Sequence, residues 1–442
     1  MTTTVAVGAH SDAVARAAFR TVDERNVMWI EVSGGRHHGA MTAAGGTTVA
    51  RAIGQATDCG LPVVIVLDSA GAEIVEGVAA LHAWGRVAHA LTLASGVVPT
   101  IVVVNGACVS GPALLLGIVD FVVMTDAAFA YVTGPEAVTE FTGFAIDRHE
   151  LGGATVHDQR SGVATLVVPT DDDAAAAVGV LLDLVPGNNL ADPPVSANGD
   201  PVERDCAIAA AVVPDTPTAG FDVLTVLDDV CDADSVVELR ARYAPNVVTA
   251  FGRVDGRVVG LIANQPGQRA GTLDIEASRK AARFVSWCDA FNVPILTFVD
   301  TPGFEPGRDL EWRGMIRHGA ELVHAYCQAT VARICIIMRK SYGGAYIVMD
   351  SRGIDNDVCL AWPTAEIAVM GASGAVQILG NKGVTESEYT ETFLNPYRAA
   401  ERGFVDLVID PRDTRRVVAA TLAQLQTKRV VVQSRKHSNS PQ

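Results

Sequence analysis

The sequence lacks lysine over most of its length: only five Lys occur among 442 residues, and none precedes Lys280. Acidic residues outnumber basic ones by 50 to 34, which gives a formal net charge of −16. A general nucleic-acid binder or a polybasic membrane-surface protein would show the opposite balance. The composition therefore excludes both of these classes.

Closely spaced cysteines and long apolar runs are also missing. None of the eight cysteines has CxxC spacing, which argues against a zinc ribbon, and His37 and His38 lack a placed third ligand, so we predict no metal site. The longest apolar runs, such as residues 61–67, have the length of strands and not of membrane spans. The first ten residues lack the basic and apolar segments of a signal peptide, so we expect a cytoplasmic protein.

Common catalytic signatures are absent as well. No Gly-Lys pair occurs, which excludes a Walker A loop, and no GxSxG nucleophile elbow is present. Asp68 and Asp300 each end an apolar run before a turn, a position more typical of turn and cap formers than of acid–base groups. His318 is left open between a helix cap and a ligand-binding residue. The lack of a convincing side-chain nucleophile or base is typical of an enzyme whose cofactor supplies the reactive group.

The chain contains an internal repeat. Residues 60–71 match residues 292–303 at an offset of 232, and residues 98–111 match residues 331–344 at an offset of 233. Two shorter blocks follow the same order: residues 49–51 with 281–283, and residues 132–135 with 369–372. Four matched blocks at a nearly constant offset indicate a tandem duplication of one domain.

Each half reads as an α/β domain. Amphipathic helices alternate with near-continuous apolar runs, which suit strands buried on both faces of a mostly parallel sheet. Residues 186–215 are rich in Pro, Gly and Asn and read as a linker. We therefore expect two domains, residues 1–200 and residues 201–442.

Two glycine-rich turns follow matching strands, at residues 106–112 and 341–346. Where such a turn opens a helix, its backbone N–H groups point outward and can act as an oxyanion hole beside an enolate. The alternative is that these glycines only permit close packing of strand and helix. The presence of the turn in both repeats favours the oxyanion hole.

The residues also resemble the carboxyltransferase (beta) subunits of biotin-dependent acyl-CoA carboxylases of the propionyl-/acetyl-CoA type. The resemblance covers about residues 25 to 440. The motifs that carry it are Asp300-Thr-Pro-Gly-Phe304, Arg339-Lys-Ser-Tyr-Gly-Gly-Ala-Tyr346, Ala361-Trp-Pro-Thr-Ala-Glu366, Asn395-Pro-Tyr-Arg-Ala-Ala-Glu401, Val132-Thr-Gly-Pro135 and Glu150-Leu-Gly-Gly-Ala154.

This resemblance implies two tandem crotonase-like (ββα spiral) domains and a hexamer built as a trimer of dimers. It implies that the first domain binds an acyl-CoA and that the second binds biotin, carried by the alpha (biotin carboxylase/biotin carboxyl carrier) subunit and not attached to this chain. The reaction that it implies moves a carboxyl group from carboxybiotin to the α-carbon of a short acyl-CoA through a thioester enolate.

The resemblance also implies roles for individual residues. Gly344 and Ala345 would serve the biotin oxygen, and Ser110 and Gly111 would serve the thioester oxygen. The remaining substrate- and biotin-binding positions that it implies are Ala70, Gly71, Gly134, Gly303, Phe304, Tyr342, Gly343, Ile347, Gly371 and Ala372.

Some residues depart from the family pattern, and they lie on the acyl-CoA side. Glu73 stands where the family has Arg, and Pro112, which has no N–H, stands where the family has Ala. We therefore expect weak binding of ordinary short acyl-CoAs, or a non-standard acyl acceptor. Ile347 stands where propionyl-CoA-selective members have Asp, so acetyl-CoA or mixed short-chain use is expected.

Two alternatives stay open. A biotin-dependent decarboxylase or transcarboxylase component would use the same residues in the opposite direction. A non-catalytic member would keep the fold for assembly while its acyl-CoA site has changed. The intact biotin-side motifs argue against the second alternative.

Overall fold

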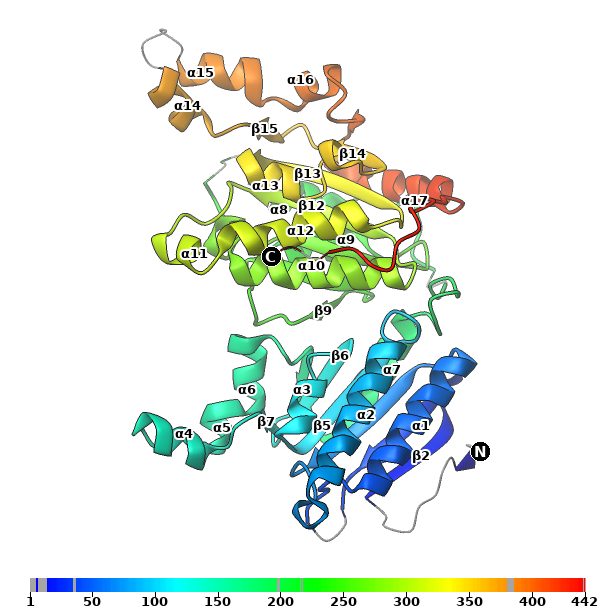
Figure 1. Cartoon of the computed structure of the whole chain (residues 1–442). Coiled ribbons are helices and arrows are strands. Elements are labelled where there is room, and N and C mark those ends of the chain that lie inside the picture. The colour runs from blue at the N-terminus through cyan, green and yellow to red at the C-terminus, as the bar shows by residue number, and fades with distance from the viewer. Residues whose placement is uncertain are drawn as a thin grey trace. The chain divides into compact units, whose positions relative to one another are not determined.

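The computed structural model describes residues 5–6, 14–34, 37–196, 199–214, 216, 218–379, 385–439 and 441. The chain divides into two compact units, Met1–Pro194 and Val195–Gln442, called here the N-unit and the C-unit. In each unit, helices pack against a sheet that is largely parallel (Figure 1).

The two sheets have the same strand order. In the N-unit the order is β1-β2-β3-β4-β5-β6-β8 with β7 beside β5, and in the C-unit it is β9-β10-β11-β12-β13-β14-β16 with β15 beside β13. In both units the strands from the third onward pair in parallel, whereas the second and third pair antiparallel. This finding confirms the predicted α/β class and the duplication.

The strands of the N-unit are β1 Val5–Ala6, β2 Ala15–Val22, β3 Arg25–Val32, β4 Val63–Ser69, β5 Thr100–Val109, β6 Phe121–Thr125, β7 Phe129–Tyr131 and β8 Leu166–Val168. Its helices are α1 Ala43–Cys59, α2 Val78–Ala94, α3 Gly111–Leu115, α4 Pro135–Thr142, α5 Arg148–Gly152, α6 Ala154–Val156 and α7 Asp171–Leu184, with a 3-10 turn at Ile74–Glu76 and a π-helical turn at His157–Ser161.

The strands of the C-unit are β9 Val237–Leu239, β10 Val247–Val254, β11 Arg257–Asn264, β12 Ile295–Thr301, β13 Arg333–Tyr342, β14 Val358–Ala361, β15 Glu366–Ala368 and β16 Leu407–Val408. Its α-helices are α8 Ala207–Val212, α9 Val223–Val230, α10 Ile275–Ala290, α11 Arg308–Trp312, α12 Met315–Gln328, α13 Gly343–Val348, α14 Ala372–Leu379, α15 Glu386–Tyr389, α16 Pro396–Glu401 and α17 Thr414–Leu425. Shorter 3-10 or π-helical turns lie at Arg269–Gly271, Arg352–Ile354, Thr390–Leu394 and Pro411–Asp413.

The long helix before each site strand has matching caps. At the start of α1, the Thr42 side chain accepts from Gly45 N–H, and at the start of α10 the Asp274 side chain accepts from Ala277 N–H. Both helices are followed by a left-handed residue, Gly60 with φ 65° and Asn292 with φ 59°. Gly and Asn are the residues that accept this conformation most readily, so both helices end just before the strand that leads to the site.

The core of each unit explains the apolar runs in the sequence. Every residue of β12 and of β13 is buried, and β4 is buried at five of its seven positions. Helices α1 and α2 lie side by side along the N-unit sheet (Figure 1). Strands buried on both faces are apolar along most of their length, which removes the alternating pattern of a half-exposed sheet. The buried charges near the ends of β12 and β13 are paired, Asp300 with Arg339 and Lys340.

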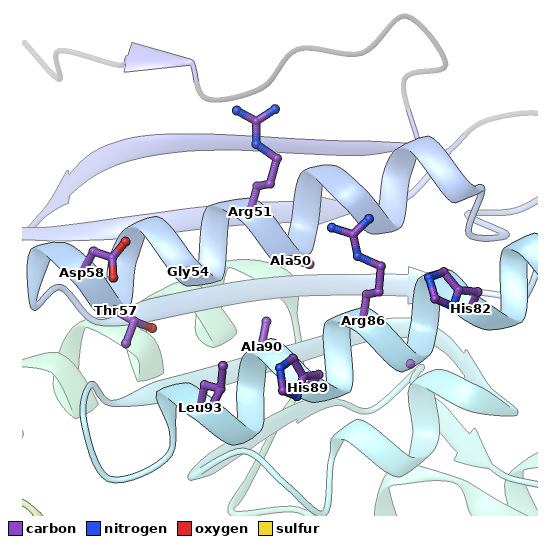
Figure 2. A pocket seen from close by; sticks show the side chains of 11 residues that line it. Ala50, Arg51, Gly54, Thr57, Asp58, His82, Arg86, His89, Ala90 and Leu93 are labelled. Atoms are coloured by element: carbon purple, nitrogen blue, oxygen red, sulfur yellow. The ribbon is translucent and has the colours of Figure 1, made fainter.

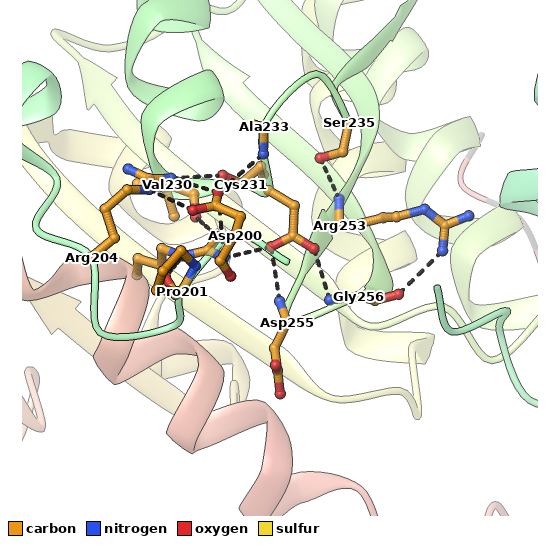
Figure 3. A network of polar contacts seen from close by, with 12 residues as sticks. Asp200, Pro201, Arg204, Val230, Cys231, Ala233, Ser235, Arg253, Asp255 and Gly256 are labelled. Atoms are coloured by element: carbon orange, nitrogen blue, oxygen red, sulfur yellow. Dashed lines mark hydrogen bonds and ion pairs between the residues drawn. The ribbon is translucent and has the colours of Figure 1, made fainter. Parts of the chain in front are cut away.

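A polar network ties the start of the C-unit to its core (Figure 3). The buried Arg415 of α17 donates to Asp232 at 2.7 Å and to the backbone carbonyl of Asp200 at 3.1 Å. Arg204 donates to both Asp200 and Asp229, each at 2.9 Å. These contacts bind part of the Pro-rich segment that reads as a linker to the C-unit, so the boundary lies near Pro194.

None of the helices in the described part of the chain combines the length and apolar character that a membrane span needs.

Candidate active site

The turn after β4 and the turn after β12 are built in the same way. The Ser69 hydroxyl accepts from Gly71 N–H, and the Thr301 hydroxyl accepts from Gly303 N–H, both at 3.3 Å. Gly71 has φ 111° and Gly303 has φ 141°, a left-handed conformation that favours glycine. The sequence repeat thus corresponds to an identical local structure at these two positions.

A second pair of hydrogen bonds fixes each turn against a preceding loop. Met41 N–H donates to Gly71 O at 2.8 Å, and Leu273 N–H donates to Gly303 O at 3.1 Å. Each turn is therefore held at two points, which fixes its position against the preceding loop.

The turns after β5 and β13 also match. Ser110 has φ 66° and ψ −122°, and Gly343 at the matching position has φ 59°. Gly111 and Gly344 follow, and they enter α3 and α13. A Cβ placed on Gly71 would lie 3.6 Å from the Ser110 Cβ, so the two N-unit turns stand next to each other.

Aromatic side chains line the C-unit turns. The half-buried Phe304 ring lies beside Gly344, where an added Cβ would meet ring carbons at 3.4 and 3.6 Å. An added Cβ on Gly371 would lie 3.4 Å from the Tyr342 ring. The Tyr342 hydroxyl donates to the Glu366 carboxylate. The pKa of Tyr342 is raised, mainly by burial and to a lesser degree by this hydrogen bond. Backbone donors and apolar ring faces therefore occur together here.

The other predicted site residues lie near these turns. Ala372 begins α14 directly after Gly371, and the half-exposed Ile347 lies in α13. Gly134 caps α4, and a Cβ on it would lie 3.7 Å from the Tyr131 ring. Ala70 N–H donates to the His38 carbonyl at 2.9 Å, so this N–H is not available to a substrate.

Asp68 and Asp300 hold the strand ends in place. Asp68 accepts from Ala107 N–H at 2.8 Å, and Asp300 accepts from the matching Lys340 N–H at 3.2 Å. The fully buried Asp300 also forms an ion pair with the nearly buried Arg339 at 2.8 Å. The turn-forming interpretation of both aspartates therefore agrees with their contacts.

Arg339 is a residue whose role sequence reasoning missed. Its guanidinium also donates to the carbonyls of Thr216 and Ala219, both at 2.8 Å. It thus holds the end of β13 to a loop that precedes α9. The available signal was a charged residue, Arg339, at the end of an otherwise apolar run, where the first repeat has Gly106.

Glu73, which departs from the family pattern, has a hydrogen-bonded neighbour. His37 Nδ1 lies 2.6 Å from the Glu73 carboxylate, and this hydrogen bond lowers the pKa of Glu73. The C-unit repeats the pair, because Glu305 and Arg269 stand at the matching positions and lie 3.2 Å apart. The expectation of weak acyl-CoA binding, which rests on Glu73 and Pro112, stays a prediction.

His318 lies in the first turn of α12 and contacts Glu321 through Nδ1 at 2.8 Å. In the described part of the chain, no three His, Cys, Asp or Glu side chains are grouped in a way that could hold a metal ion.

A cavity of about 530 Å³ lies between α1 and α2 (Figure 2). Its lining includes Arg51, Arg86, His82 and His89 over a floor of small residues. None of the predicted site residues lines it, so we do not assign it to the site.

The comparisons with known proteins show the family of this chain. Residues 25–440 match the carboxyl transferase domain family. This match covers most of the chain, and the chain belongs to that family and is an enzyme of that kind.

Individual relatives are similar over about three quarters or more of their own length. The propionyl-CoA carboxylase beta chain of Saccharopolyspora erythraea is 42% identical over 95% of this chain and 82% of its own length. The methylmalonyl-CoA decarboxylase subunit alpha of Veillonella parvula is 43% identical over 86% of this chain and 76% of its own length. A crystal structure of transcarboxylase 12S, described as a hexamer with hydrolysed methylmalonyl-CoA bound, matches with a TM-score of 0.96 and 37% identity over 99% of this chain and 90% of that chain.

Proposed function

We propose that this chain is the carboxyltransferase subunit of a biotin-dependent acyl-CoA carboxylase. It moves a carboxyl group between carboxybiotin and the α-carbon of a short acyl-CoA such as acetyl-CoA or propionyl-CoA. The observation that carries the proposal is the duplicated strand-end turn within a chain of the carboxyl transferase family. Two oxygens gain negative charge in such a transfer, one on each partner, and the two units offer one turn for each.

The N-unit turns at Gly71 and Ser110 serve the thioester in this proposal. Ser110 is exposed beside the buried Gly71, and the turns are held rigid by the hydrogen bonds at Gly71. A rigid donor stabilises developing charge more than a mobile one, because it needs no reorganisation during the reaction.

The C-unit turns fit a biotin ring. The ureido ring of biotin is planar and carries one carbonyl oxygen, so its binding site needs N–H donors beside an apolar wall. Gly344 and Ala345 stand at the start of α13, where the first N–H groups lack partners inside the helix. The Phe304 ring forms a wall beside Gly344, and a Cβ on Gly303 would meet nothing within 4 Å, which leaves the space open.

Carboxybiotin, when bound, supplies the carboxyl group and the base for the α-proton. The chain itself then orients the two substrates and stabilises the charge on their oxygens. This division of labour agrees with the roles of Asp68 and Asp300, whose carboxylates hold the strand ends in place.

A decarboxylase or transcarboxylase component is the second candidate. The observation that favours it is the 43% identity to the Veillonella parvula decarboxylase subunit and the 41% identity to the methylmalonyl-CoA carboxyltransferase 12S subunit of Propionibacterium freudenreichii. The site residues serve both directions, so the partner subunits decide between the two candidates.

The partners follow from the same proposal. The carrier of biotin is a biotin carboxylase/biotin carboxyl carrier (alpha) subunit, and six copies of this chain form the active assembly. The hexamer of transcarboxylase 12S supports this assembly. The proposed location is the cytoplasm.

The experiment is a carboxyl-transfer assay with the purified protein. Methylmalonyl-CoA or malonyl-CoA is incubated with free biotin, and the loss of the carboxylated thioester is followed. A partner biotin carboxylase with ATP and bicarbonate then tests the forward direction on a panel of acyl-CoAs. Transfer in neither direction with any thioester would refute the proposed function.

A further inference from the structure

The acyl-side turn has fewer free backbone donors than its repeat. Ser110 N–H donates to the carbonyl of Tyr131 at 2.9 Å, at the end of the β5–β7 ladder. Pro112 has no N–H at all, whereas Ala345 stands at the matching position of the C-unit. Only the Gly111 N–H of these three positions therefore remains to meet a thioester oxygen.

Ser110 keeps a side chain where the repeat has none. Its φ of 66° lies in the left-handed region, where the matching Gly343 has φ 59°. Such a conformation is costly for a residue with a Cβ and tends to persist at functional positions. No folding role explains the serine, because its exposed side chain makes no capping hydrogen bond to α3.

The serine stands on a rigid support. The Trp84 ring lies directly under Gly111, where an added Cβ would meet ring carbons at 3.3 Å. The same indole donates its N–H to Gly71 O at 3.0 Å, so one side chain braces both turns. The Ser110 Cβ lies beside Gly71, at the junction of the two turns.

We propose that the Ser110 hydroxyl is a hydrogen-bond donor to the thioester oxygen of the acyl-CoA, in place of the N–H that Pro112 lacks. The proposal rests on the proposed function and adds a side-chain donor to the thioester site. The C-unit turn does not need such a donor, because Ala345 has an N–H where Pro112 has none. With the Ser110 hydroxyl as donor, the N-unit turn can tolerate proline at residue 112.

The hydroxyl acts as a donor and not as a nucleophile. A serine nucleophile needs a base within hydrogen-bond reach, and within the described residues no side chain is hydrogen-bonded to the Ser110 hydroxyl. No covalent bond to the serine forms, and the acyl group stays on CoA.

The test compares three proteins in the transfer from methylmalonyl-CoA to free biotin. Ser110→Ala keeps the Cβ and the strained backbone and removes only the hydroxyl. Ser110→Gly removes the hydroxyl and also relieves the strain. We expect both variants to lose about 10²-fold in kcat, the typical effect of one oxyanion-hole donor, with KM nearly unchanged. Ser110→Gly should also raise the melting temperature above that of Ser110→Ala.

The exposed Ser95, at the end of α2, supplies the matched control, and Ser95→Ala should keep wild-type rates. A kcat for Ser110→Ala within twofold of wild type would overturn the proposal. A fully active Ser110→Gly variant would overturn it too, since the hydroxyl would then be dispensable. A wild-type protein without transfer on any thioester would instead refute the proposed function, and the role of Ser110 with it.

Discussion

At the scale of single residues, the candidate site depends on positions where a side chain is missing. Gly344 leaves its N–H open beside the Phe304 ring, and a Cβ there would already touch ring carbons at 3.4 Å. Close approach of a substrate oxygen to backbone donors requires this lack of bulk. Substitutions at such positions should therefore affect the reaction more than the fold.

We predict that Gly344→Val lowers carboxyl transfer by at least about 10²-fold, because the valine methyl groups block the approach to the backbone donors. The hexamer should persist, as measured by light scattering. Gly85→Val is the matched control, since a Cβ at the exposed Gly85 of α2 meets nothing within 4 Å. Normal transfer by Gly344→Val would remove this glycine from the proposed oxyanion hole.

Ile347 should influence the choice of substrate. It is 48% exposed in α13, three residues after Gly344. We predict that the wild type uses acetyl-CoA or a mixture of short acyl-CoAs, and that Ile347→Asp shifts the ratio of kcat/KM toward propionyl-CoA by about tenfold, the scale of one methylene group. Strict propionyl-CoA preference of the wild type would contradict this prediction.

At the scale of elements, one buried lysine connects α10 to the loop before β10. Lys280 Nζ donates to the carbonyls of Arg240, Tyr243 and Val247 at 2.8–3.0 Å. Burial, partly offset by Glu238, lowers the pKa of Lys280 to about 7. The loop continues to Asn246, which donates to Thr272 O at 2.8 Å, next to the segment that pairs with the Gly303 turn.

The pH dependence of stability follows from this shift. An unfolded lysine keeps its proton up to about pH 10.4, whereas the folded one loses it near pH 7. Between these values the unfolded chain binds more protons, so this group raises the free energy of unfolding as pH increases.

We predict that Lys280→Met removes this contribution. The difference in unfolding free energy between wild type and variant, measured by urea denaturation, should move in favour of the wild type from pH 7 to pH 9.5. Lys428→Met is a control, since Lys428 pairs with Asp357 at a site that is only partly buried. A difference that is independent of pH would show that Lys280 keeps its proton throughout this range.

At the scale of the whole molecule, each unit has its own core but leaves large apolar side chains in water. Phe141 and Phe144 are 92% and 79% exposed in the N-unit, and Trp312 and Ile316 are 76% and 83% exposed in the C-unit. Large exposed apolar groups of this kind are typical of surfaces that become buried on assembly.

We therefore predict that light scattering gives six times the chain mass of 46.3 kDa. Trp312→Asp should shift the population toward smaller species, because burying a carboxylate without a partner is costly. Its transfer activity should fall with the loss of the hexamer. A wild-type monomer with full activity would contradict both the assembly and its coupling to activity.

Much of this protein could be predicted from its sequence. The repeat predicted the duplication, and the strands obey its offsets: β4 and β12 differ by 232 at both ends, and β5 and β13 by 233. The motifs predicted the family, which the match over residues 25–440 confirms. The elements that carry the repeat and the motifs are helix caps, apolar runs and glycine turns. Each of these depends on residues close together in the chain, so the sequence alone predicts them.

Only the tertiary structure decided which groups at the site are occupied. Ser110 N–H donates to the Tyr131 carbonyl, Glu73 is hydrogen-bonded to His37, and Asp300 is paired with Arg339. Each of these contacts joins segments that are 21 or more residues apart in the sequence. A pattern of residue types identifies the turns that hold the site, but the packing of distant segments determines which donors and charges stay free to act on a substrate.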